Sequence, residues 1–187
     1  MIKTVIFDFF GVLQTDGYKS WLTKQGIPLE GEYYDLSRRS DLGLLADNEF
    51  FEELSKLSGI EITEEEIDQS TSMYTEVIAI VEKVRETYPT GLLSNAPSGY
   101  IREILQEHNL EHLFNTIVVS GEIGFVKPDR RIFEHILGVM NANAKETIFI
   151  DDSLLNVEGA RAVGINAIHF QSPKQLKEEL AALGVDA

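Results

Sequence analysis

The stretch VIFDFFGVL, Val5–Leu13, contains a short apolar run that ends at the acidic residue Asp8. Its β-branched and aromatic side chains favour a strand, and a strand without polar residues is typical of a parallel sheet that is covered on both faces. Gly11 interrupts the run soon afterwards. The stretch therefore predicts a buried strand that carries Asp8 at its carboxyl end.

Similar apolar runs recur along the chain, and helical patterns separate most of them. A last helix is expected after Ser172–Gln175, which combines an N-cap serine, a proline at the first helical position and a glutamine at the third. Strands that alternate with helices predict an α/β protein, with a mostly parallel sheet and helices on both faces. The predicted strands are Gly91–Asn95, Thr116–Ser120, Thr147–Asp152 and Ala167–Phe170.

The region between the first and second strands breaks this alternation, because it contains helical patterns and no convincing strand. Phe50, Phe51 and Leu54 follow helical spacing, and Thr63 with Glu66 forms a capping box. We expect a catalytic core of residues 1–15 and 89–187 and a helical cap of residues 16–88. Beside the first strand, such a cap is well placed to act as a lid; the alternative is a subdomain that only adds stability.

Composition restricts the classes of partner. The 187 residues carry a net charge of −15, and no basic run is present, which argues against nucleic acid and anionic membranes. No apolar run approaches the roughly 18 residues that span a bilayer. There is no cysteine, which removes disulfides and cysteine nucleophiles. We expect a cytoplasmic protein that acts on a small molecule.

Side chains that can react or bind a ligand follow several predicted strands. Asp8, Ser94-Asn95 and Asp151-Asp152 end three of them, and Lys127 lies in the loop after a fourth. Ligands bind beyond the carboxyl ends of an open parallel sheet. Three clustered carboxylates need a cation to coexist, and an all-oxygen site suits Mg²⁺. Lys127 would add positive charge opposite the metal, and Ser94 could hold phosphate oxygens.

These motifs together resemble the haloacid-dehalogenase-like superfamily. Val5–Leu13 looks like its first motif, Leu93-Ser94-Asn95 its second, Lys127-Pro128-Asp129 its third, and Ile150–Ser153 with Asn156 its fourth. All four occur in the family's order over nearly the whole chain. The resemblance implies a Rossmann-like core with a helical cap inserted after the first motif.

Because most members of this superfamily are phosphatases, the resemblance implies an Mg²⁺-dependent phosphatase that acts on a small phosphorylated metabolite. Asp8 would be the nucleophile that forms an aspartyl-phosphate. Ser94, Asn95 and Lys127 would bind the phosphoryl group, with Lys127 neutralising it. The metal ligands would be Asp8, the backbone carbonyl of Phe10, Asp152 and, directly or through water, Asp151.

One position departs from the family's pattern. Phosphatases of this type usually carry a second aspartate two residues after the nucleophile, as acid and base, and here that residue is Phe10. Such a group contributes about 10²–10⁴-fold, or roughly 3–5 kcal/mol of barrier. We expect slow turnover of alkyl phosphates and faster turnover of activated ones. Asp16 is acidic and near in sequence, but the sequence offers no geometric reason to assign it the role.

Two alternatives remain open. Haloacid dehalogenases also lack the second aspartate, so Phe10 favours them, but they need no metal and lack the acidic pair Asp151-Asp152. The other alternative is a binding protein whose site has lost activity. Retention of Asp8, Ser94, Lys127 and both acidic residues argues against it.

Overall fold

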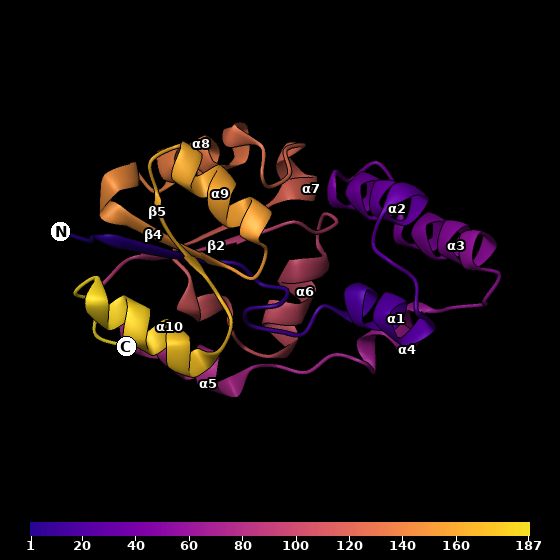
Figure 1. Cartoon of the computed structure of the whole chain (residues 1–187), viewed down its shortest axis with the longest axis horizontal. Coiled ribbons are helices and arrows are strands. Elements are labelled where there is room, and N and C mark those ends of the chain that lie inside the picture. Colours follow the sequence, from indigo (N-terminus) through magenta and orange to yellow (C-terminus); the bar gives the residue numbers. More distant parts are fainter.

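The computed structural model describes residues 1–187, apart from the side chain of Asp47. Within this part of the chain, five parallel strands form one sheet in the order β3-β2-β1-β4-β5. β1 therefore lies at the centre, with β2 and β4 as its neighbours (Figure 1). The predicted α/β class and the parallel sheet are confirmed. The strands are β1 Thr4–Phe7, β2 Thr90–Ser94, β3 Thr116–Val119, β4 Thr147–Asp151 and β5 Asn166–His169.

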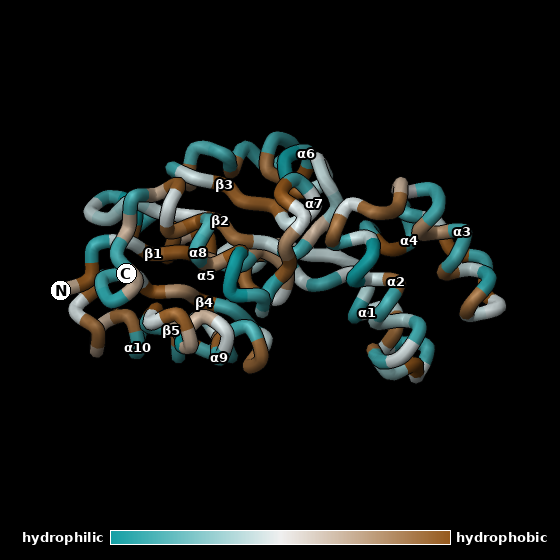
Figure 2. Tube along the Cα trace, turned by 90° about the horizontal axis from the view of Figure 1, so that it is seen from above, coloured by the Kyte–Doolittle hydropathy of each residue, from teal (hydrophilic) through white to brown (hydrophobic). Residues whose placement is uncertain are grey.

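Helices cover both faces of the sheet because successive strand side chains point to opposite faces. Val5 and Phe7 of β1 are buried with residues of α5 (Thr75–Arg85), α6 (Tyr100–Glu107) and α10 (Pro173–Ala182). Ile6, between them, is buried with residues of α8 (Arg130–Val139) and α9 (Leu154–Ala162). The three central strands β1, β2 and β4 are buried along their length, whereas the edge strands β3 and β5 are partly exposed (Figure 2).

Local signals place several helix ends where the sequence predicts them. Ser172 caps α10 by accepting a hydrogen bond from the Gln175 N–H, and Thr63 caps α4 (Glu64–Asp68) by accepting one from the Glu66 N–H. α3 (Asp47–Ser58) ends at Gly59, whose φ of 70° is readily adopted by glycine. The remaining short helical elements are α7 Ser120–Ile123 and the 3₁₀ turns Glu111–Leu113 and Ala144–Glu146.

The helices α1 (Gly17–Gln25), α2 (Gly31–Asp41), α3 and α4 form a separate body beside the carboxyl end of the sheet (Figure 1). We call these four helices and their connections the cap. They have a hydrophobic cluster of their own, which stabilises the cap independently of the sheet. The buried members of this cluster are Trp21, Leu22, Leu36, Leu54, Ile62 and Ile67.

The packing of α5 bears on the predicted cap limits of residues 16–88. Val77, Ile80, Val81 and Val84 of α5 are buried in the cluster that includes β1, and α5 contacts β2 and α10. A helix whose apolar face packs on the sheet stabilises the core. We therefore propose that the cap ends ahead of α5 and that α5 belongs to the core. The spacing of these residues indicates a helix, but it cannot show which body the helix packs against.

None of the helices in the described residues is long and apolar enough to cross a lipid bilayer. The cytoplasmic location stays a prediction.

Candidate active site

The predicted site residues meet at the carboxyl edge of the sheet. Asp8 directly follows β1, Ser94 ends β2 and Asp151 ends β4. The chain passes from β1 to β2 and β3 on one side and then crosses to β4 on the other side of β1, which makes this edge a topological switch point where open α/β sheets bind ligands. Carboxylate oxygens of Asp8, Asp151 and Asp152 lie within 4.8 Å of one another.

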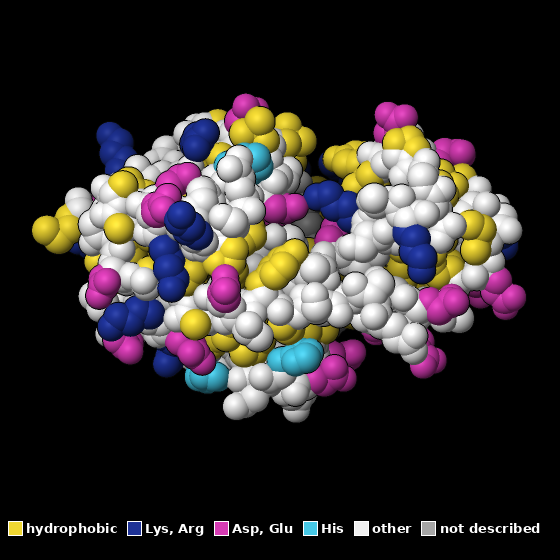
Figure 3. Space-filling model, turned by 60° about the horizontal axis from the view of Figure 1, so that its bottom comes forward, with side chains coloured by type: hydrophobic (Ala, Val, Ile, Leu, Met, Phe, Trp, Pro, Cys, Tyr) yellow, Lys and Arg dark blue, Asp and Glu magenta, His cyan; other side chains and the backbone are white. Residues whose placement is uncertain are grey.

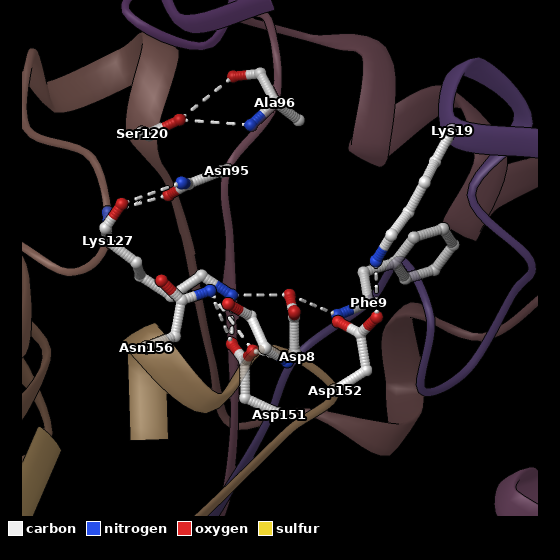
Figure 4. Close-up of polar contacts among 11 residues, drawn as sticks. Asp8, Phe9, Lys19, Asn95, Ala96, Ser120, Lys127, Asp151, Asp152 and Asn156 are labelled. Atoms are coloured by element: carbon white, nitrogen blue, oxygen red, sulfur yellow. Dashed lines mark hydrogen bonds and ion pairs between the residues drawn. The ribbon is translucent and has the colours of Figure 1, made fainter. Parts of the chain in front are cut away.

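Lys127 joins two of these carboxylates (Figure 4). Its Nζ lies 2.6 Å from Asp8 Oδ1 and 2.7 Å from Asp151 Oδ2, and all three residues are buried. Burial alone would lower the pKa of Lys127, but the charges of Asp151 and Asp8 raise it, so the side chain is held as a cation. Buried charges require such pairing to be tolerated.

The surroundings of Asp8 disfavour the ionised form of its carboxyl group. Burial and the nearby charge of Asp151 raise the pKa of Asp8 well above its usual range, and Lys127 opposes them. A hydrogen bond of 2.7 Å from the Phe9 N–H to Asp8 Oδ1 fixes the side chain. Further positive charge beside Asp8 would favour its ionised form, which is the form a nucleophile needs.

The two neighbouring acids, Asp151 and Asp152, differ in how many of their carboxylate contacts are already made within the protein. Asp151 Oδ1 accepts hydrogen bonds from the Ser153 N–H at 2.8 Å and from Asn156 Nδ2 at 3.0 Å, in addition to the contact of Oδ2 with Lys127. The Asp152 side chain is 25% exposed and contacts Lys19 Nζ at 3.0 Å. Asp152 therefore has more free capacity to bind a ligand than Asp151.

Gly11 allows Asp152 to approach the loop after β1. The φ of Gly11 is 80°, and a Cβ at this position would lie 2.4 Å from the Asp152 carboxyl carbon. Any other residue would have to displace the carboxylate. Gly11, which the sequence shows only as the end of an apolar run, thus helps to bring Asp152 beside Asp8.

Ser94 and Asn95 have different roles in the structure. Ser94 is buried, and its Oγ has no hydrogen-bond partner among the described residues, so its hydrogen-bonding capacity is unused; phosphate binding by Ser94 stays a prediction. Asn95 Oδ1 accepts from the Lys127 N–H at 2.8 Å, and Asn95 Nδ2 donates to the Lys127 carbonyl at 3.1 Å. The Asn95 side chain therefore positions Lys127, while substrate binding by Asn95 stays a prediction.

The cap closes the site on one side. A cleft of about 300 Å³ between the core and the cap is lined by Asp8, Phe10 and Lys127 and by cap residues that include Asp16, Lys19 and Asp41. Figure 3 shows the recess between the two bodies, with charged side chains inside it. The cap thus borders the site, and its action as a lid stays a prediction.

The sequence does not single out Lys19 or Asp41, because no motif surrounds either of them. Burial alone would lower the pKa of Lys19, but its contact with Asp152 raises it. Burial and the charge of Asp16 raise the pKa of Asp41 to about 7. Burial also raises the pKa of Asp16, whose side chain caps α1 by accepting from the Lys19 N–H.

Comparison with known proteins agrees with the fold. Residues 30–170 match the family described as haloacid dehalogenase-like hydrolase, and the chain belongs to this family of hydrolases. The resemblance carried by the four sequence motifs is confirmed.

Particular relatives are phosphatases. The chain is 29% identical to a sesquiterpene phosphatase of Aspergillus oryzae, over 90% of this chain and 89% of that protein. It is 25% identical to a D-ribitol-5-phosphate phosphatase of Bacteroides thetaiotaomicron, over 98% of each. Among solved structures, one similar structure is that of a HAD family enzyme of the same bacterium in complex with magnesium and inorganic phosphate. It superposes with a TM-score of 0.70 at 24% sequence identity, and the match covers 91% of this chain and 95% of that chain.

Proposed function

We propose that the protein is an Mg²⁺-dependent phosphatase that hydrolyses a small phosphate monoester through an aspartyl-phosphate at Asp8. The observation that carries the proposal is the position of Lys127, which contacts both Asp8 and Asp151 at the switch point of the sheet. The similarity to two phosphatases along most of the chain supports it.

The donor atoms fit magnesium. The three clustered carboxylates offer only oxygen atoms as ligands, and oxygen is the donor that Mg²⁺ prefers. Asp8, Asp152 and the Phe10 carbonyl would hold the ion, and Asp151 would contribute directly or through water, since Lys127 and Asn156 already engage that side chain. When bound, Mg²⁺ neutralises charge on the phosphate and on Asp8, so that the two anions can meet.

The proposed hydrolysis takes place in two steps at Asp8. An Asp8 oxygen attacks phosphorus, the bond from phosphorus to the ester oxygen breaks, and the alcohol leaves as an anion that takes a proton from solvent. Water then attacks phosphorus, the bond to Asp8 breaks, and inorganic phosphate is released. Lys127 Nζ and Ser94 Oγ bind phosphoryl oxygens in both steps, because the former is a buried cation and the latter a buried hydroxyl without a partner among the described residues.

Phe10 restricts which leaving groups can depart quickly. Its side chain lines the cleft but cannot donate a proton to the departing alcohol. Substrates whose alcohols leave readily as anions, such as aryl phosphates, should be hydrolysed faster than simple alkyl phosphates.

The two alternatives are tested by the same assay. Phe10 favours a dehalogenase, but the clustered carboxylates of Asp8, Asp151 and Asp152 would repel the anion of a haloacid. A binding protein would not need the buried Lys127 between two carboxylates. Phosphate release from an aryl phosphate should require Mg²⁺ and disappear in Asp8→Asn, with no halide released from 2-chloropropionate. Halide release without Mg²⁺ would support the dehalogenase, and no release of either product would support the binding protein.

A further inference from the structure

The cleft beside the catalytic carboxylates has an apolar rim that the proposed chemistry does not use. Leu29, Tyr34 and Leu155 are 39%, 43% and 57% exposed, and all three line the cleft. They come from the loop after α1, from α2 and from α9, so the cap and the core both contribute. Large apolar side chains that are exposed around one cavity indicate a site that an apolar ligand covers.

The floor of the cleft near the reacting atoms is aromatic. The rings of Phe10 and Tyr100 stack with centroids 6.1 Å apart and an interplanar angle of 25°, and both residues line the cleft. The Tyr100 hydroxyl donates to Asp68 Oδ1 of α4 at 2.8 Å, which turns its polar atom toward the cap. Phe10 thus presents an apolar surface where the leaving group of a phosphate ester would lie.

The charged groups of the cleft are coupled to its catalytic end. Lys19 contacts Asp152, the Asp16 side chain accepts from the Lys19 N–H, and the charges of Asp16 and Lys127 act on Asp41. A ligand with an anionic group at the carboxylates and an apolar group extending from it would use both kinds of surface.

We propose that the substrate is a phosphate monoester of an apolar alcohol or phenol, whose hydrocarbon part lies on Phe10 and Tyr100 and is covered by Leu29, Tyr34 and Leu155. The inference rests on the proposed phosphatase function and specifies the substrate class of that site. Esters of polyhydroxylated alcohols should bind less tightly, because hydroxyl groups that lie against these five side chains would be unpaired, although polar residues such as Arg38 and Glu64 line other parts of the cleft.

Alkylphosphonates test the apolar surface without turnover, because their carbon–phosphorus bond is not hydrolysed by this chemistry. The wild-type protein with Mg²⁺ is titrated with methylphosphonate and with hexylphosphonate in a calorimeter. Each buried methylene contributes about 0.8 kcal/mol, so hexylphosphonate should bind at least about 30-fold more tightly, even with partial burial. Equal affinities, or no binding of either phosphonate, would overturn the inference.

Two adjacent leucines on α9 provide a matched pair of variants. Leu155 lines the cleft, whereas Leu154, 51% exposed, is not among the described residues that line it. Leu155→Gln should lower the hexyl-to-methyl affinity ratio by about 5-fold, and Leu154→Gln should leave it unchanged. The same effect from both variants, or from neither, would contradict the inference.

The two proposals fail separately. If the affinity ratio is high but no ester is hydrolysed with Mg²⁺, the phosphatase assignment is wrong and the apolar binding surface remains. If aryl phosphates are hydrolysed with Mg²⁺ but the two phosphonates bind equally, the phosphatase assignment remains and the substrate class is wrong.

Discussion

Lys19 of the cap places its Nζ 3.0 Å from Asp152 Oδ2, at the carboxyl end of β4 in the core. The pair joins the first cap helix to one of the three clustered carboxylates, so the position of the cap and the charge of the site are linked. Both side chains are partly exposed, 52% for Lys19 and 25% for Asp152, and solvent therefore weakens the pair.

Replacing Lys19 should affect cation binding more than stability. In Lys19→Met, Asp152 loses a competing cation, and the apparent Kd for Mg²⁺ should fall by about 3-fold, whereas the free energy of unfolding should change by less than about 1 kcal/mol. Calorimetric titration with Mg²⁺ measures the first quantity and urea unfolding the second. Lys24→Met, on the same helix, is the control; weaker Mg²⁺ binding in Lys19→Met alone would contradict the competition.

Replacing Lys127 should affect both activity and stability. Lys127→Met leaves Asp8 and Asp151 buried without their cation, which should cost about 3–5 kcal/mol of unfolding free energy. Phosphate release should fall by at least about 10²-fold, because an electrostatic contact to the phosphoryl group is lost. Urea unfolding and an aryl phosphate assay measure the two effects. A variant that keeps wild-type turnover would remove Lys127 from the proposed site.

Restoring an acid at position 10 should widen the range of leaving groups. Phe10→Asp supplies a proton donor beside the departing oxygen, and turnover of an alkyl phosphate should rise by about 10-fold or more. Turnover of an aryl phosphate should change less, because its leaving group needs no proton, and the ratio of the two rates is the readout. Phe10→Asn, which is polar but cannot act as the acid, is the control. If Asp and Asn give the same ratio, the missing acid does not explain the leaving-group preference.

Asp41 should make the protein less stable as the pH rises. Burial raises the pKa of Asp41 from 3.8 to about 7, so between these values the folded state holds a proton that the unfolded state has released. Stability therefore falls over this window. Asp41→Asn should be more stable than the wild type at pH 8 by on the order of 1–3 kcal/mol, and the difference should vanish near pH 4.

Urea unfolding at several pH values between 4 and 8 measures this effect. Asp35→Asn, on the exposed side of the same helix, is the control, because it removes a charge that is not in the interior. If Asp41→Asn shows the same difference from the wild type at every pH, the titration of Asp41 does not govern the pH dependence of stability.

The strands could be predicted well from the sequence because each is a short apolar run with a clear end. All five predicted strands are present within a residue or two of their expected bounds. The capping residues Thr63 and Ser172 each accept a hydrogen bond from the backbone N–H three positions later, so these helix starts could be predicted from the local sequence. The limit of the cap stays a prediction, since α5 has the same periodicity whichever body it packs against.

The amino-acid sequence by itself determined the alternating α/β order and the place of Asp8, Ser94, Lys127, Asp151 and Asp152 at strand ends or in the loop between them. These features depend on local patterns and on the edge at which parallel strands end. The contacts of Lys19 with Asp152 and of Asn95 with Lys127, and the apolar rim of the cleft, were decided only by the tertiary structure. They join residues far apart in the chain, and no local pattern specifies which distant side chain will meet another when the cap packs beside the sheet.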